Sequence, residues 1–461
     1  MSLNQLLQEI MEEITPKPEE RVKLERLYQA YMDRARRAAE ELTSDFKIFL
    51  GGSLAKDTAL SEDTDIDLFV LLSPDLSKKE FRRLGLEIGE RTFLGHKPIE
   101  RYADHPYLEA TVDGVKISVV PTYRVEPMIW KSPVDRTFYH VQYIKERLRE
   151  EQKREVRLLK KFMKGVGTYG AEVRVKGFSG YLCELLILHH RTFLNLLQAV
   201  QCWSPPVIID IEDQYRGDVE TIQEIFKGQP LVVIDPVDKG RNVAASPSAK
   251  SLASFISASW WFLRRPSRIF FYPPPTQVDV DEELSKAGDL ILLTFRHGWM
   301  VEDTLYPQLE RMTKKIGVKL KENGFRLLRA GIYSDFMSAS YIIFELESKT
   351  LPKRFLHMGP PPFKAEEAFV KKNLNRGFSV WISEEGRWVS SRDREIVDAR
   401  KLVEEIVKGV MIPKGIRNQV RETVRILADE QIKKDLGVNP RLREYLEDFF
   451  LTKEFWVLVN H

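Results

Sequence analysis

The sequence predicts a multidomain α/β and α+β protein: a mixed-sheet head, a helical central region and an α+β C-terminal part. Its 461 residues are enough for roughly two to four domains. Strand and amphipathic helix patterns alternate up to residue 125, whereas residues 141–199 follow helical spacing. Strands return after "FFYPPPTQ", whose prolines stop regular structure near residue 272. We therefore expect domains at residues 1–142, 143–271 and 272–461.

The elements of the first domain follow from local patterns. The first 45 residues predict two helices separated by Pro16 and Pro18. "FKIFLGGS" predicts a strand that runs into a Gly-Gly-Ser turn, "DIDLFVLL" predicts a buried strand, and "KKEFRRLGLEIGERTF" predicts a helix. "IERYADHPYLEATV" and "VKISVVPTY" predict one strand each, joined as a hairpin at Asp113 and Gly114.

Beyond the first domain the helices of 141–199 are interrupted by the glycine-rich loop "GVGTYGAEVRVKGFSG". "LVVIDPVDKGRNVAAS" predicts a strand that leaves through a loop, and "AKSLASFISASWWFLRR" predicts a helix. In the last domain we expect strands at "LILLTFR", "ASYIIFELE" and "FSVWISEEGRWVSS". Helices are expected at "YPQLERMTKKIGVKLKENG", "EEAFVKKNL" and "RLREYLEDFF".

Composition excludes several classes of protein. The hydrophobic share of 43% and the charged share of 30% are those of an ordinary globular chain. Cys183 and Cys202 cannot form a disulfide framework or a zinc site, and free thiols suit a reducing compartment. No apolar stretch approaches the ~18 residues of a membrane span, and the acidic N-terminus is no signal peptide. We expect a cytoplasmic protein without a membrane partner.

Charge is unevenly distributed along the chain. The net charge is only +3, but residues 311–330 hold seven Lys or Arg against one Glu, and residues 144–165 hold nine against four. Such runs are typical of solvated helix faces and also of surfaces that bind an RNA backbone. The sequence leaves both interpretations open.

The strongest chemical signal is "GGSLAKDTALSEDTDID", from Gly51 to Asp67. Asp65 and Asp67 project from the same side of a strand, so both carboxylates can bind a hard cation. The Gly-Gly-Ser turn leaves backbone N–H groups free for a phosphate, and Ser53 adds a hydroxyl. The apolar flank "LFVLL" makes idle carboxylates costly, which argues against a simple surface acid pair.

With this segment the sequence resembles the DNA polymerase β-like nucleotidyltransferase superfamily. Within it, the chain is similar to the archaeal (class I) CCA-adding tRNA nucleotidyltransferases. Further similar segments follow in order at family-like spacing, between Phe49 and Trp388: "RYADHPYLEA", "VDRTFYH", "EVRLLKKFMKGVGTYGAE", "KGFSGYLCELLI", "DPVDKGRNVAA", "LYPQLER" and "GRW".

The resemblance implies template-independent addition of C, C and A to the tRNA 3′ end from CTP and ATP. It implies a nucleotidyltransferase head, a helical neck and a C-terminal body and tail that bind the tRNA acceptor stem and 3′ end. Two Mg²⁺ ions would be held by the catalytic residues Asp65 and Asp67, one activating the 3′-hydroxyl and one holding pyrophosphate. The oligomeric state stays open, a homodimer included.

The same resemblance assigns nucleotide-binding positions, although packing or solvation would explain each residue taken alone. They are Ser53, Lys56, His140, Lys160, Tyr169 and Arg241, the last helping to choose C or A. Lys56 stands where the family usually has Arg, so it offers a point charge in place of a bidentate fork. RNA-binding positions are Asp104, His105 and Arg329, with Tyr306 and Tyr333 as further members of that surface.

One family residue is missing, because Ser118 stands where the third catalytic Asp is expected. A serine hydroxyl is a weak ligand and almost no base at pH 7, so we expect nucleotide binding to persist while transfer slows by orders of magnitude. Four explanations stay open: an inactive or diverged RNA-binding paralogue, a slow enzyme, an engineered inactive form, or a third acid from Glu109 or Asp63. A polymerase with another RNA substrate is a further alternative.

Overall fold

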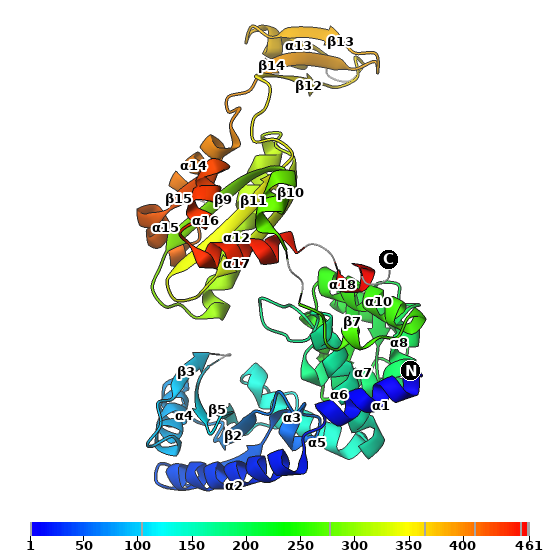
Figure 1. Ribbon diagram of the computed structural model, residues 1–461, viewed down its shortest axis with the longest axis vertical. Helices are drawn as coiled ribbons and strands as arrows, with labels where there is room; N and C mark the ends of the chain where they lie inside the picture. Colours follow the sequence, from blue (N-terminus) through cyan, green and yellow to red (C-terminus); the bar gives the residue numbers. More distant parts are fainter. Residues whose placement is uncertain are drawn as a thin grey trace. The chain divides into compact units, whose positions relative to one another are not determined.

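The computed structural model describes residues 2–102, 105–275, 278–363, 366–409, 412–451 and 454–458. They divide into two compact units, Met1–Pro275 with Lys453–His461 and Thr276–Thr452, the first mostly blue to green in Figure 1 and the second yellow to red. In the described part of the chain no helix is long and apolar enough to cross a membrane.

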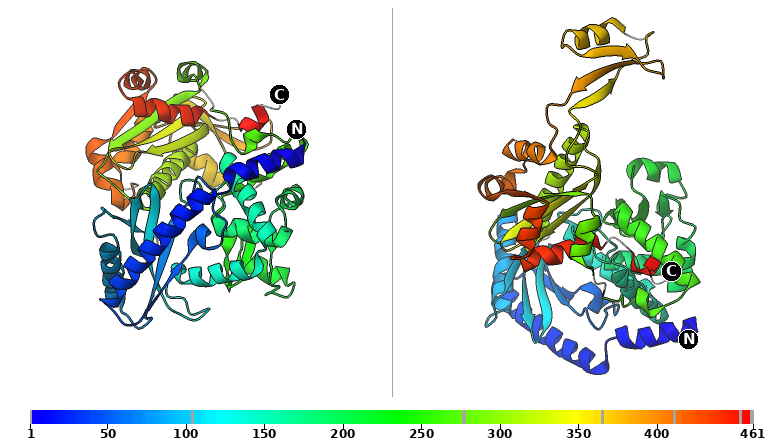
Figure 2. Two further views of the ribbon diagram at one scale, coloured as in Figure 1. Left: turned by 60° about the horizontal axis from the view of Figure 1, so that its bottom comes forward. Right: turned by 45° about the horizontal axis from the view of Figure 1, so that its top comes forward.

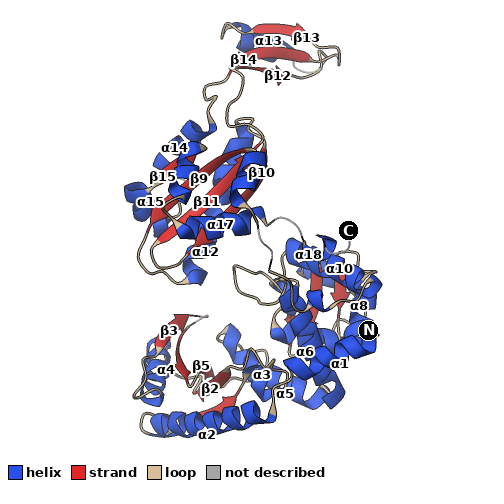
Figure 3. Cartoon of the chain, viewed as in Figure 1, coloured by secondary structure: helices blue, strands red, loops and turns tan. Residues whose placement is uncertain are grey.

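The first unit begins with the mixed sheet that the sequence predicts. Its order is β1-β2-β5-β4-β3, and β2 and β5 are parallel whereas the other neighbours are antiparallel. The strands are β1 (Phe46–Leu50), β2 (Ile66–Leu72), β3 (Ile99–Tyr102), β4 (Pro106–Val112) and β5 (Val115–Tyr123). Helices α2 (Pro18–Glu40) and α4 (Lys78–Thr92) cover one face of this sheet, as Figure 3 shows.

Alternation along the strands decides which residues reach the covered face. Ile66 and Leu68 of β2, and Ile117 and Val119 of β5, are buried in the core beneath α2 and α4. Successive side chains of a strand point to opposite faces. The residues between these apolar ones, Asp67 among them, therefore project from the opposite face, which we call the open face.

The expected hairpin at Asp113 and Gly114 is confirmed, since β4 and β5 pair antiparallel on either side of it. Both residues have positive φ, 49° and 79°, as a two-residue type I′ turn requires. The prediction of one strand over 99–112 was wrong, because β3 and β4 are two strands that pair with each other.

The rest of the first unit is largely helical and surrounds a separate core. That core is built by α1 (Leu3–Ile14), α6 (Glu150–Gly165), α7 (Gly180–His190), α8 (Phe193–Val200), α10 (Ala249–Arg264) and α18 (Phe455–Leu458). A small sheet adds β6 (Val207–Ile209), β7 (Leu231–Asp235) and β8 (Asp238–Asn242). Further helices are α3 (Gly52–Ala55), α5 (Thr137–Arg147) and α9 (Val219–Ile225), with 3₁₀ turns at Pro133–Arg136, Val243–Ala245 and Arg268–Phe270.

The second unit contains a four-stranded antiparallel sheet of order β10-β11-β9-β15 with helices on both faces (Figures 1 and 2). Its strands are β9 (Asp289–Arg296), β10 (Leu327–Ser334), β11 (Ala339–Leu346) and β15 (Arg425–Ala428). One face packs on α12 (Glu302–Glu322), α14 (Ala399–Lys408), α15 (Arg417–Thr423) and the 3₁₀ turn Lys414–Ile416. The other packs on α11 (Val280–Lys286), α16 (Glu430–Leu436) and α17 (Pro440–Phe450). Burial on both faces explains why the sequences of β9 and β11 are nearly continuous runs of apolar residues.

A second, smaller sheet of the same unit has the order β12-β14-β13. It consists of β12 (Arg354–Met358), β13 (Ser379–Ile382) and β14 (Trp388–Asp393), with α13 (Glu366–Leu374) beside it. The His357 ring stacks on Phe369 of α13 at 5.8 Å, and Ser390 donates to Asn373 at 3.0 Å. The segment "FSVWISEEGRWVSS", predicted as a strand, forms the β13–β14 hairpin.

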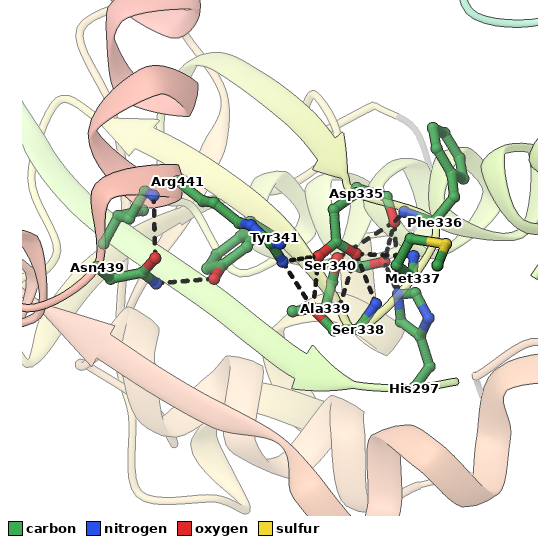
Figure 4. A network of polar contacts seen from close by, with 12 residues as sticks. His297, Asp335, Phe336, Met337, Ser338, Ala339, Ser340, Tyr341, Asn439 and Arg441 are labelled. Atoms are coloured by element: carbon green, nitrogen blue, oxygen red, sulfur yellow. Dashed lines mark hydrogen bonds and ion pairs between the residues drawn. The ribbon is translucent and has the colours of Figure 1, made fainter. Parts of the chain in front are cut away.

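Figure 4 shows how Asp335 fixes the turn between β10 and β11. Its carboxylate accepts hydrogen bonds from the backbone N–H groups of Met337, Ser338 and Ala339, at 2.9, 2.7 and 3.0 Å. Burial opposes ionisation, but these donors and the Ser338 hydroxyl outweigh it and hold the pKa of Asp335 well below its usual value. The network holds Phe336 at a positive φ of 57°.

Candidate active site

Asp65 and Asp67 lie at the start of β2, Asp65 directly before the strand and Asp67 as its second residue. Within the described part of the chain neither carboxylate has a hydrogen bond or an ion pair. Burial, and next the charge of Asp65, raise the pKa of Asp67 to about 6, against the opposing charge of Lys56. Burial also raises the pKa of Asp65. Two neighbouring acids whose pKa values are raised by burial are an arrangement that a bound cation would stabilise.

The Gly-Gly-Ser turn lies directly against Asp67. The Gly51 N–H donates to the Asp67 carbonyl at 2.8 Å, and Gly52 has a positive φ of 63°. A Cβ on Gly52 would lie 2.1 Å from Asp67 Oδ2, and one on Gly51 would lie 2.3 Å from the Phe69 ring. Gly52 therefore allows the carboxylate to lie beside α3, which contains Ser53, and Gly51 allows the Phe69 ring to lie against the same turn.

Three residues of neighbouring strands form one row across the open face. Asp67 pairs with Ser118 in the parallel ladder of β2 and β5, and Ser118 pairs with Glu109 in the antiparallel ladder of β5 and β4. Ser118 is buried, and Glu109 forms an ion pair with Arg101 of β3 at 3.1 Å. The middle of the row thus carries a hydroxyl between two strands that carry carboxylates.

The donor set suits a divalent cation. Asp65 and Asp67 offer hard carboxylate oxygens, the ligands that Mg²⁺ prefers. Because Gly52 has no side chain, the space next to it is available to Asp67 Oδ2. Among the described residues no three His, Cys, Asp or Glu side chains already lie close enough to hold a metal ion. The pair fits a metal whose remaining ligands come from a substrate, from water or from a side chain that moves.

Lys56 and Lys160 belong to a buried ion group centred on Glu184 of α7. Lys56 Nζ lies 2.5 Å from Glu184 Oε2, and the Thr58 hydroxyl donates to Oε1 at 2.6 Å. Lys160 Nζ lies 3.7 Å from the same carboxylate and donates to the Thr58 carbonyl at 3.0 Å. Burial opposes ionisation of Glu184, but Lys56 and Lys160 outweigh it and keep its pKa below the usual value. Burial lowers the pKa of Lys160, against the charge of Glu184.

Further ion pairs tie the loop before Asp65 to α6. Arg157 NH2 lies 2.5 Å from Asp57, and Arg157 Nε donates to the Ala59 carbonyl at 2.9 Å. Lys161 pairs with Glu62 at 2.8 Å, and Lys164 pairs with Asp63 at 3.0 Å. Arg157, Lys160 and Lys161 are buried, so part of the basic run 144–165 is used inside the unit and does not form a solvated or RNA-facing surface.

A second polar group is centred on the fully buried Asp235 at the end of β7. Asp235 Oδ2 accepts from His140 Nε2 at 2.9 Å and from Arg241 at 2.7 Å, and the Tyr181 hydroxyl donates to Oδ1 at 3.3 Å. The His140 ring stacks on Tyr181 at 4.0 Å. Burial lowers the pKa of His140, against the opposing effect of Asp235. Lys56 Nζ lies 5.8 Å from the Tyr181 ring, so this group adjoins the ion group around Glu184.

The remaining expected residues lie in several places. Burial raises the pKa of Tyr169, which itself forms an isolated β-bridge with Phe178. His105 donates to the Pro121 carbonyl at 2.5 Å within the head, and Asp104 lies outside the described residues. Arg329 is in the second unit, where it pairs with Glu345 and donates to the Phe449 carbonyl at 3.1 Å.

Family models match three consecutive stretches of the chain. They are the nucleotidyltransferase domain over residues 32–153, the second domain of tRNA nucleotidyltransferase over 154–272, and the C-terminal domain of the CCA-adding enzyme over 286–429. The CCA-adding enzyme of Methanopyrus kandleri is 33% identical over 97% of each chain. That of Archaeoglobus fulgidus is 36% identical over 94% of this chain and 97% of its own.

The chain belongs to the CCA-adding enzyme family. The resemblance read from the sequence is thereby confirmed, and so is the nucleotidyltransferase head of this tRNA nucleotidyltransferase. Solved structures that are similar include the RNA terminal uridylyl transferase Cid1, with 15% identity over 60% of this chain and 99% of its own and a TM-score of 0.48. Escherichia coli MS115-1 CdnC with ATP is 16% identical over 59% and 95%, with a TM-score of 0.44.

Sequence reasoning missed the acids that organise this CCA-adding family member. Glu184 and Asp235 lie within segments that carry the resemblance, "KGFSGYLCELLI" and "DPVDKGRNVAA", but neither was assigned a role. The available signal was an acid inside an apolar run, because a buried carboxylate needs a cationic partner. For Glu184 those partners, Lys56 and Lys160, were themselves predicted site residues.

Proposed function

We propose that the chain adds C, C and A to the 3′ end of tRNA, with CTP and ATP as donors. The observation that carries the proposal is the unpartnered pair of Asp65 and Asp67 against the Gly51–Gly52 turn. It occurs in a chain that matches curated CCA-adding enzymes along nearly its whole length. Two neighbouring carboxylates beside the N-terminus of α3 are suited to a metal-bound triphosphate.

Enzymes with this nucleotidyltransferase domain use a divalent metal, and we propose Mg²⁺ held by Asp65 and Asp67. Bound Mg²⁺ would neutralise triphosphate charge and lower the pKa of the attacking hydroxyl. Ser53 and the N–H groups of its turn would receive phosphate oxygens. Lys56 would add positive potential behind the phosphates while it stays paired with Glu184 at 2.5 Å.

For the nucleobase we propose a pocket that includes His140 and Arg241. Both are held by Asp235, which restricts their side chains to one arrangement. Fixed donors can discriminate C from A by the hydrogen bonds that each base offers or lacks. Tyr169 and Lys160 would complete the nucleotide site, Lys160 by holding Thr58 and Glu184 in place.

We propose that the functional divisions are a head at 1–142, a neck at 143–271 and a body with tail at 272–461. The family-model boundaries at 153/154 and near 272 support this division. Asp104, His105 and Arg329 remain proposed contributors to RNA binding. Free thiols at Cys183 and Cys202 support a cytoplasmic location.

The test is extension of a tRNA that lacks CA or CCA, with radiolabelled CTP or ATP, Mg²⁺ and excess protein. We expect additions limited to the missing nucleotides, and loss of extension by Asp67→Asn with unchanged tRNA affinity. Random-length tails, or extension of primers unrelated to tRNA, would contradict the proposal. A template-independent polymerase with another RNA substrate would produce that result.

Ser118 favours a second candidate, a relative that binds tRNA and nucleotide but does not transfer. The hydroxyl stands opposite Asp67, where it cannot supply a third charged ligand. This candidate predicts tRNA and CTP binding without extension at any protein concentration. Equilibrium binding of both ligands beside the extension assay separates the two functions.

A further inference from the structure

We propose that Glu109 supplies the third carboxylate of the metal site, in place of the aspartate that Ser118 replaces. The proposal rests on the proposed function, since it assumes that Asp65 and Asp67 hold a divalent metal. It assigns to β4 a ligand that the neighbouring strand β5 lacks.

The strand register carries the proposal. Asp67, Ser118 and Glu109 are directly paired across three adjacent strands. The apolar neighbours of each, such as Leu68, Val119 and Leu108, lie in the core beneath α2 and α4. Because paired residues project to the same side of a sheet, all three side chains emerge on the open face.

The spacing is compatible with one shared metal. Adjacent strands lie about 4.8 Å apart, so the backbones of Asp67 and Glu109 are separated by about 10 Å. A glutamate side chain is one methylene longer than an aspartate, and carboxylate–metal distances of about 2.1 Å on each side complete the span. Ser118 lies between them, but its short side chain ends in a neutral hydroxyl and cannot bring a charged group to the metal position.

Electrostatics agrees with this geometry. The Glu109 charge raises the pKa of both Asp65 and Asp67, as a minor contribution after burial. The three carboxylates therefore already repel each other across the open face. A divalent cation between them would relieve that repulsion.

Glu109 has to turn toward the pair, because its present partner is Arg101 at 3.1 Å. The Arg101 side chain is 46% exposed and lies on β3, the edge strand of the sheet. Ion pairs of such exposure contribute only about 0–1 kcal/mol. Exchange of Arg101 for a divalent metal is therefore a small energetic step.

The other acid that the sequence offered has its partner on α6. Asp63 pairs with Lys164 at 3.0 Å, and Lys164 also lies 3.7 Å from Glu62. This group joins the loop before β2 to α6. Releasing Asp63 would break one of the ion pairs between this loop and α6, whereas releasing Glu109 disturbs only the edge of the sheet.

The test is Mn²⁺ binding, followed by electron paramagnetic resonance in the presence of a non-hydrolysable CTP analogue. We expect Glu109→Gln to lower the affinity for one of the bound Mn²⁺ ions by about 10- to 100-fold. Glu100→Gln is the matched control, because Glu100 is a neighbouring acid that pairs with Arg82 at 3.4 Å on the α4 side. Arg101→Gln, which frees Glu109, should tighten Mn²⁺ binding.

Rescue provides the second readout. Ser118→Asp in the Glu109→Gln background should restore the lost Mn²⁺ affinity, because it returns a carboxylate to the same row. The proposal is overturned if Glu109→Gln binds Mn²⁺ like Glu100→Gln while Asp67→Asn abolishes binding. If Asp67→Asn is also without effect, the proposed metal site itself is wrong, and the two failures are thereby distinguished. Thermal melts confirm that each variant is folded.

Discussion

Asp67 and Ser118 lie directly opposite each other on the parallel strands β2 and β5. Opposite side chains on one face of a sheet are about 5 Å apart, so an aspartate at position 118 would place a second charge beside Asp67. The pKa of Asp67 is already raised to about 6 without it. The serine therefore keeps a further repelling charge away from Asp67.

In the Glu109→Gln background, where the third carboxylate is absent, Ser118→Asp should raise nucleotide transfer by at least about tenfold, because a correctly placed ligand and base contributes far more than a hydroxyl. The same change should lower the melting temperature of the metal-free protein and enlarge its stabilisation by Mg²⁺. Single-turnover extension and melts with and without Mg²⁺ measure both effects. A Glu109→Gln variant that transfers faster than Glu109→Gln/Ser118→Asp would show that the strand assignment fails.

Metal-free stability should depend on the ionisation of Asp67. Its folded pKa of about 6 lies above the unfolded value. The stabilising contribution of this group is fully present below about pH 4 and is lost as pH rises through about 6. Asp67→Asn should therefore be more stable than wild type by roughly 1–3 kcal/mol at pH 8, and the difference should shrink toward pH 4.

Urea unfolding across this pH range measures the difference, with the exposed Asp33→Asn as control. In the wild type, Mn²⁺ affinity should fall below about pH 6, since the metal competes with a proton for Asp67. A pH-independent gap between wild type and Asp67→Asn would contradict the assignment of the raised pKa to this residue.

Glu184→Gln should destabilise the protein by about 3–5 kcal/mol, because it leaves Lys56 and Lys160 buried without their counter-charge. Glu184 is fully buried, and both lysines are buried around it. Glu150→Gln on α6, where the side chain is 77% exposed, should change stability by less than about 0.5 kcal/mol. Equal effects of the two variants in denaturant unfolding would argue against an energetic role for the buried group.

Asp235→Asn should reduce discrimination between CTP and ATP, because His140 and Arg241 lose the carboxylate that orients them. The pKa of His140, already lowered by burial, should fall further when the opposing charge of Asp235 is removed. Nuclear magnetic resonance titration of the histidine and competition between CTP and ATP are the measurements. The exposed Asp213→Asn should leave both unchanged, and an unaltered His140 titration in Asp235→Asn would refute the coupling.

Arg311→Gln should weaken tRNA binding and reduce the slope of log affinity against log salt by about 1, the value for one lost phosphate contact. Arg311, Lys315 and Lys414 line a cavity of about 600 Å³ beside α12 in the second unit. Lys286→Gln on α11, whose side chain pairs with Glu282 of the same helix, is the control. An unchanged salt slope would place the RNA backbone elsewhere.

The sequence alone was sufficient to predict structural features that depend on residues close together in the chain. The buried strand β2, the strand β5 and the Asp113–Gly114 turn all follow from local patterns, and each is found as expected. The strand β6, of three residues, is too short to show a period.

Features that depend on distant residues were not accessible. Lys56 and Glu184 are separated by 128 positions, so no local pattern indicates that one neutralises the other. The basic run 144–165 looked like a single charged face, but its cations divide between solvent and buried partners on the preceding loop. Pairing of this kind is fixed by tertiary packing, which a single sequence does not encode in its spacing.

The return of α18 to the first unit has a consequence for biosynthesis. Trp456 is 1% exposed in the core that also contains α1 and α10, and its Nε1 donates to Ser257 at 3.3 Å. A ribosome therefore has to translate the whole of the second unit before Trp456, which completes the core of the first unit, becomes available. Until then the nascent chain exposes an apolar gap over α10, a site where a chaperone could bind.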